Sequence, residues 1–199
     1  MKKLMQSISS TPLILIVLSF LISSNIHAKQ SLGLVKIEDK KIIEHLKQQI
    51  RYEYESAYLY EARAHYALNQ GLPGTSSWFK KQAQEERAHA DKVINHLRDA
   101  GITDFSLPTL KSVPIKFKSI LEAFETSLAR EKELSRAIEK TAILAQEKKE
   151  YYTIKLMNWF IDEQIEEETM FQDTMDRIKW FLKMNNYPGM DDFLGKRLK

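Results

Sequence analysis

The segment FKKQAQEERAHADKVINHL, residues 79–97, decides the fold. Its positions three and four residues apart, from Phe79 to Val93, share one face of an α-helix, the face that a globular protein buries. Glu86 and His89 lie on this face, where a carboxylate and an imidazole are costly unless a partner satisfies them. The segment therefore predicts a buried helix whose inner face carries a polar site.

Helices with similar apolar faces are predicted on both sides of this segment. The four predicted helices cover residues 39–69, 75–101, 118–146 and 151–184, with Thr75 or Ser76 as the N-cap of the second. The breaks at 71–74 and 148–150 are short, so the helices that they join are expected to form antiparallel hairpins. The connection after the second helix has about sixteen residues and reaches ~50 Å when extended, enough to cross the bundle. The sequence thus predicts an all-α fold, a four-helix bundle with one long crossover, followed by a short fifth helix over residues 191–198.

Each of the four long helices carries an acidic residue on its apolar face. These residues are Glu53, Glu86, Glu131 and Glu167, and each lies near the midpoint of its predicted helix. In a bundle of helices of similar length the midpoints form one layer, so the four carboxylates and His89 are predicted to meet there. Buried carboxylates repel one another, and a pair of bound metal ions is the simplest charge balance. Carboxylates with one imidazole suit Fe or Mn and can also hold Zn, but of these we expect iron if the chemistry uses dioxygen.

The composition narrows the class of protein. The chain has 199 residues, 43% of them hydrophobic and 29% charged, as expected for one soluble domain. It has no cysteine, which excludes disulfides and thiolate metal sites. The formal net charge of +3 gives no support to nucleic-acid binding.

The first 28 residues are predicted to be a secretory signal peptide. A basic start at Lys2 and Lys3 precedes an apolar run over residues 11–22, and a polar stretch ends at Ala28. Cleavage there would leave residues 29–199 as one di-iron domain, exported to the periplasm or secreted, with no stable membrane anchor. Ile26 is larger than the residue preferred three places before a cut, so an uncleaved anchor is an alternative. A cytoplasmic location would follow if the signal is not used.

Two motifs resemble the signatures of non-haem bacterial ferritins. They are QEERAH at residues 84–89 and WFIDEQIEEE at residues 159–168, and the similarity extends from about Ile42 to the C-terminus. The resemblance implies a ferritin-like fold without haem, which oxidises Fe(II) with dioxygen or peroxide and stores ferric mineral in a 24-subunit shell of identical chains. It also implies residue roles. The first iron site would be formed by Glu53, Glu86 and His89. The second would be formed by Glu131 and Glu167, with Gln164 close by. A third would use Glu85, Glu163 and Glu166, and Tyr60 would be the tyrosine adjacent to the centre.

The last long helix separates this chain from relatives of that family. Rubrerythrins, haem bacterioferritins and other di-iron carboxylate proteins carry a second Glu-x-x-His motif there, where this chain has Gln164-x-x-Glu167. We expect a looser centre that releases oxidised iron inward. The alternatives are a rubrerythrin-like di-iron peroxidase or oxidase, and a periplasmic metal carrier that forms no cage.

Overall fold

A computed structural model describes residues 35–196 of the chain. These residues form five helices: α1 (Lys40–Asn69), α2 (Pro73–Asp99), α3 (Ile120–Lys148), α4 (Tyr151–Lys183) and α5 (Tyr187–Lys196). No described helix is long and apolar enough to span a membrane. The predicted signal peptide and the last residues of the predicted fifth helix, 197–199, lie outside the described residues.

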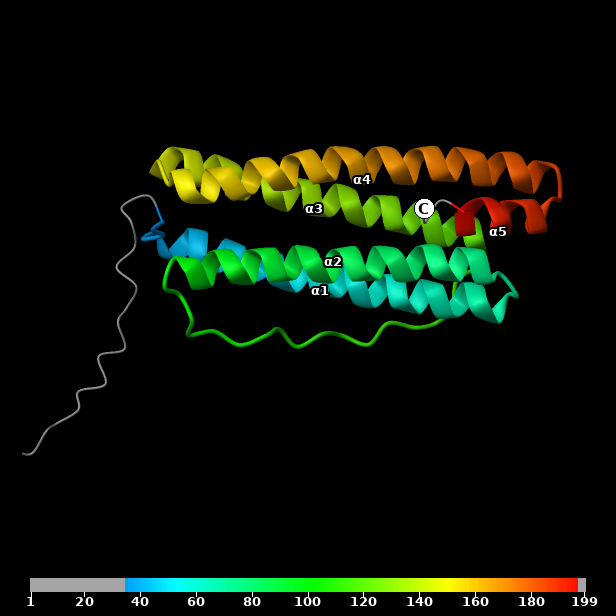
Figure 1. Cartoon of the computed structure of the whole chain (residues 1–199), viewed down its shortest axis with the longest axis horizontal. Coiled ribbons are helices and arrows are strands. Elements are labelled where there is room, and N and C mark those ends of the chain that lie inside the picture. The colour runs from blue at the N-terminus through cyan, green and yellow to red at the C-terminus, as the bar shows by residue number, and fades with distance from the viewer. Residues whose placement is uncertain (1–34, 197–199) are drawn as a thin grey trace, which may run out of the picture.

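The four long helices pair as two antiparallel hairpins. α1 lies beside α2, and α3 lies beside α4, while residues 100–119 run back along the length of the bundle to join the two hairpins (Figure 1). Lys149, which adopts left-handed backbone angles (φ 57°, ψ 32°), turns the chain between α3 and α4. The predicted all-α four-helix bundle, with its long crossover and short fifth helix, is confirmed.

The predicted start of the second helix is wrong. α2 begins at Pro73, so Thr75 and Ser76 lie inside its first turn and are both buried. The cap comes instead from Asp191 of α5, whose carboxylate accepts hydrogen bonds from the Gly74 amide at 2.9 Å and the Thr75 amide at 2.7 Å. Gly74 is required at this contact, because a Cβ atom there would lie 2.0 Å from the Asp191 carbonyl oxygen. A distant acidic residue therefore supplies the cap that local sequence was expected to supply.

Other helix ends differ from the prediction by smaller amounts. α3 starts at Ile120, after Ser119, whose hydroxyl accepts a hydrogen bond from the Glu122 amide at 3.0 Å. It also continues to Lys148, two residues beyond the predicted end. α5 starts at Tyr187, earlier than the predicted Asp191, because the Asn186 side chain accepts a hydrogen bond from the Gly189 amide at 2.9 Å.

The interior of the bundle contains two hydrophobic clusters. The aromatic cluster lies towards α5 and is built on buried aromatic side chains, namely Tyr60, Trp78, Phe79, Phe124 and Phe171. The aliphatic cluster lies towards the other end of the bundle and is built mainly on Ile42, Leu46, Ile50, Val93, Leu97, Leu134, Ile138 and Leu156. On each long helix, the acidic residue predicted at the midpoint is buried. Along the helix it follows the residues of one cluster and precedes those of the other.

Candidate metal centre

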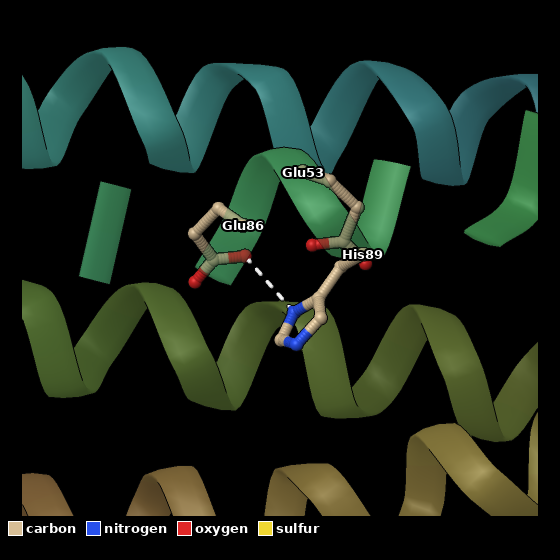
Figure 2. Close-up of side chains that lie close together, drawn as sticks. All are labelled: Glu53, Glu86 and His89. Atoms are coloured by element: carbon tan, nitrogen blue, oxygen red, sulfur yellow. Dashed lines mark ion pairs between the residues drawn. The ribbon is translucent and has the colours of Figure 1, made fainter. Parts of the chain in front are cut away.

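Glu53, Glu86 and His89 converge inside the bundle. Glu53 comes from the middle of α1, and the other two come from one face of α2, a turn apart (Figure 2). One ligand atom from each lies within 4.8 Å of the others, and His89 Nδ1 is 3.5 Å from Glu86 Oε2. All three side chains are buried. Two carboxylates and an imidazole at this spacing form a set that can hold a divalent cation.

Several carboxylate oxygens of this region have no hydrogen-bond partner among the described residues. They are Glu53 Oε2, Glu86 Oε2 and Glu167 Oε2, each of which is buried. The other oxygen of Glu53 accepts a hydrogen bond from Gln49 Nε2 at 2.6 Å. Buried oxygens that lack a donor are unusual in a folded interior, and a bound cation would satisfy them.

Glu131 of α3 is fully buried, and its charge acts on Glu86. The hydroxyl of Tyr60 donates a hydrogen bond to its Oε1, and Gln164 Nε2 donates to its Oε2 at 3.2 Å. Tyr60 of α1 and Gln164 of α4, which were predicted to lie near this centre, thus both contact Glu131 of α3. Gln164 also donates to the Glu131 carbonyl oxygen at 3.1 Å, which links α4 to α3 at the centre.

Burial and mutual repulsion dominate the electrostatics of the four carboxyls. Burial raises the pKa of Glu53, and it raises the pKa of Glu86 well above its ordinary value, with further repulsion from Glu131. Burial, followed by repulsion from Glu131, raises the pKa of Glu167 to about 9. Burial also raises the pKa of Glu131, although the hydrogen bonds from Tyr60 and Gln164 oppose this change. Burial and repulsion therefore disfavour the ionised form of these carboxyls, and a bound cation would offset both costs.

Burial lowers the pKa of His89, so its imidazole is neutral at physiological pH and has a lone pair available for a metal. Its ring meets the edge of Trp159 at a centroid distance of 5.5 Å. The Lys92 ammonium lies 3.9 Å from the centroid of the same indole, which fixes that wall of the site. No pattern in the sequence indicated Lys92. A signal does exist for Gln49, because it lies four residues before Glu53 on the buried face of α1.

The three residues assigned to a third site line a pocket beside the buried centre. Glu85 comes from α2, and Glu163 and Glu166 come from α4. The pocket has a volume of about 280 Å³ and is also lined by His89 and Glu167, so it adjoins the buried carboxylates. Glu163 Oε2 lies 3.7 Å from His89 Nε2, and Gln82 donates a hydrogen bond to Glu85. Glu166 is exposed, in contrast to the buried members of the centre.

The chain is similar to known ferritins in sequence and in structure. It is 38% identical over 133 residues to the bacterial non-heme ferritin of Staphylococcus aureus (strain USA300), covering 67% of this chain and 80% of that protein. The bacterial non-heme ferritin of Staphylococcus epidermidis is 36% identical over 137 residues, covering 69% and 82%.

Two solved structures show the same fold. A humanized archaeal ferritin superimposes with a TM-score of 0.76 at 30% identity, covering 80% of this chain and 98% of that one. An open-pore ferritin from the archaeon Archaeoglobus fulgidus superimposes with a TM-score of 0.72 at 29% identity, covering 79% and 96%. The sequence model of the ferritin-like domain matches residues 43–181, which include every residue of the candidate centre. The chain therefore belongs to the ferritin family.

Proposed function

We propose that this protein is an iron-storing ferritin with ferroxidase activity, which oxidises Fe(II) at a two-iron centre within each subunit. The buried layer of Glu53, Glu86, Glu131 and Glu167 with His89 carries the proposal, because three of its oxygens lack a hydrogen-bond partner within the described part of the chain. A protein interior does not retain such a layer for stability, and cations are its natural partners.

In this proposal iron is the substrate, and the protein supplies ligands and proton exchange. Glu53 and His89 hold one ferrous ion, Glu131 and Glu167 hold the second, and Glu86 lies between the two. Two Fe(II) ions each give one electron to dioxygen, which takes up two protons and leaves as hydrogen peroxide. Oxidation raises the positive charge of each ion, so the fixed carboxylates favour the ferric product.

The pocket of Glu85, Glu163 and Glu166 provides a route away from the centre. It shares His89 and Glu167 with the buried layer and adds carboxylates that are closer to solvent. Ferric ions prefer such oxygen ligands. We propose that oxidised iron leaves through this pocket to a mineral held inside a shell of 24 subunits.

Sizing after iron loading tests storage. The purified protein is supplied with Fe(II) in air, and its elution is followed by absorbance and by iron content. We expect iron far beyond two atoms per chain to elute with a very large particle. Iron limited to about two atoms per chain on a small species would contradict storage and favour a metal carrier.

A peroxide assay separates storage from a di-iron peroxidase. The iron-loaded protein is mixed with hydrogen peroxide and a reductant, and peroxide consumption is followed over many turnovers. A ferritin is expected to consume peroxide only in proportion to the Fe(II) supplied. Sustained consumption driven by the reductant would instead support a rubrerythrin-like peroxidase.

Export of the protein is also a proposal, because the predicted signal peptide lies outside the described residues. An exported ferritin would take up Fe(II) outside the cytoplasm and limit its reaction with peroxide there. Cell fractionation with mass measurement of the protein tests this. A chain that begins near residue 29 outside the cytoplasm is expected, and a full-length chain in the cytosol would contradict export.

A further inference from the structure

Arg63 is a buried cation that the candidate metal centre does not use. It lies on α1 with 1% of its surface exposed. Its Nε donates to the Ala123 carbonyl oxygen and its Nη2 to Thr126 Oγ1, both at 2.9 Å, but its Nη1 has no hydrogen-bond partner among the described residues. A buried guanidinium with an unused donor is costly, and a bound anion would satisfy it.

Arg63 lines a pocket of about 510 Å³ between α1, α3 and the crossover. Three further cations line the same pocket, namely Arg51, Lys111 and Arg130. The two lining carboxylates are already engaged: Glu55 lies 2.9 Å from Arg51 and 3.3 Å from Arg130, and Glu133 lies 3.5 Å from Arg130. The lining therefore has an excess of positive charge, which favours an anionic ligand.

The rest of the pocket wall is largely apolar. Leu59 comes from α1, and Leu110, Val113 and Phe117 come from the crossover. Arg63 Cζ lies 5.5 Å from the centroid of the Phe117 ring, so the charged and apolar parts of the wall adjoin one another. The pocket volume is within the roughly 300–1,000 Å³ of small-molecule sites, more than a lone inorganic ion requires.

We propose that this pocket binds a small organic anion, an oxyanion headgroup on a short apolar chain. Its headgroup would interact with Arg63 and Lys111, and its chain would contact Leu59, Leu110 and Phe117. The site adjoins the carboxylate centre through Tyr60, whose ring centroid is 5.4 Å from Arg63 Cζ and whose hydroxyl donates to Glu131. None of the residues that we place at the iron centre lines this pocket, so anion binding can be measured on protein without iron.

Calorimetric titration of the purified full-length protein tests this site. Octanoate and octyl phosphate serve as the two anionic probes, with 1-octanol as the neutral match and inorganic phosphate as the headgroup alone. We expect at least one anionic probe to bind at least about tenfold more tightly than octanol and inorganic phosphate, and to weaken as salt is added. Equal binding of octanol would overturn the role of charge, equal binding of inorganic phosphate would overturn the role of the apolar wall, and no binding of either anion would overturn the site.

Three variants assign the binding to this pocket. Arg63→Met removes the buried charge and Lys111→Glu reverses an exposed one at the rim, so each is expected to weaken binding roughly tenfold or more. The matched control is Lys132→Glu, an exposed residue of α3 outside the pocket, which should bind the probes as the parent does. If Arg63→Met fails to fold, Lys111→Glu decides alone, and unchanged binding in that variant contradicts the proposal. Glu86→Ala should keep the binding, which separates this test from that of the iron centre.

Discussion

The aromatic cluster near α5 and the carboxylate centre are neighbours within one bundle, and they differ in how their side chains are satisfied. Phe79 and Phe124 contact each other at a centroid distance of 4.6 Å and are fully buried, as the hydrophobic effect favours. Glu53 and Glu86 are equally buried, but each keeps an oxygen that lacks a donor within the described residues. The first region stabilises the fold, whereas the second lowers the stability of the metal-free chain.

Tyr60 belongs to both regions. Its ring lies 5.7 Å from that of Phe171 and 6.2 Å from that of Phe79, while its hydroxyl donates a hydrogen bond to Glu131. Burial raises the pKa of Tyr60 well above its ordinary value, so the hydroxyl keeps its proton and remains a donor. The aromatic cluster thereby holds one carboxylate of the centre in place. Substitutions on either side of Tyr60 can therefore separate stability from function.

The largest expected effect is on the aromatic side. Phe124→Ala removes a fully buried ring and is expected to cost about 3–5 kcal/mol of stability, because a cavity replaces its contacts. The thermal midpoint of the protein should fall by roughly 6–20 °C. Fe(II) oxidation below the new midpoint should stay near the parent rate. Loss of oxidation in the folded variant would show that the two regions are not separable.

Glu86→Ala is expected to show the opposite behaviour. It removes the carboxylate that we place between the two irons, and should slow Fe(II) oxidation by about a hundredfold or more, measured by stopped-flow absorbance. The metal-free thermal midpoint should not fall, since a buried and poorly satisfied carboxylate has been removed. Glu85→Ala is a control on the adjacent position, and it should oxidise iron faster than Glu86→Ala does. A native rate in Glu86→Ala would contradict our site assignment.

The metal-free protein should lose stability as the pH rises. Glu167 has a pKa of about 9 in the folded chain, above the ordinary value of 4.5, so the unfolded chain releases this proton first. Its contribution to stability is fully present below about pH 4.5 and is lost as the pH rises towards 9. Thermal midpoints of metal-free protein are therefore expected to fall between pH 7 and 9. Glu167→Gln should reduce this slope, and an unchanged slope would show that Glu167 is ionised in the folded protein.

The smallest expected effect concerns the cap of α2. Asp191→Ala removes hydrogen bonds to the Gly74 and Thr75 amides and should cost about 1 kcal/mol, or a midpoint decrease of about 2–4 °C. Asp191→Asn keeps one side-chain oxygen that can accept a hydrogen bond, so its midpoint should fall less than that of Asp191→Ala. Asp192→Ala, at the exposed neighbouring position, is the control and should change the midpoint less. Equal effects of Asp191→Ala and Asp192→Ala would contradict the cap.

The spacing of apolar residues along a helix is a local property of the sequence. It predicts which side chains of that helix face the interior of the bundle. The spacing of Glu86 and His89 on an apolar face placed both residues inside the bundle, and the same rule applied to Glu53, Glu131 and Glu167. The Asp191 cap joins residues more than a hundred positions apart, so no local pattern predicts it. Arg63 is three residues after Tyr60, at the edge of the apolar face of α1, but a charged residue in such a position is usually exposed. Its burial depends on Phe117 and on α3, which periodicity in α1 does not describe.

The most direct test of the carboxylate centre is the stoichiometry of the first oxidation. Purified metal-free protein is mixed with increasing amounts of Fe(II), from below to well above about two per chain, in air-saturated buffer, while dioxygen consumption and peroxide production are recorded together. We predict a fast phase that saturates at about two Fe(II) per chain, uses about one dioxygen for every two irons and is lost in Glu86→Ala. A slow oxidation without saturation, equal in the parent and in Glu86→Ala, would contradict a two-iron centre at these residues.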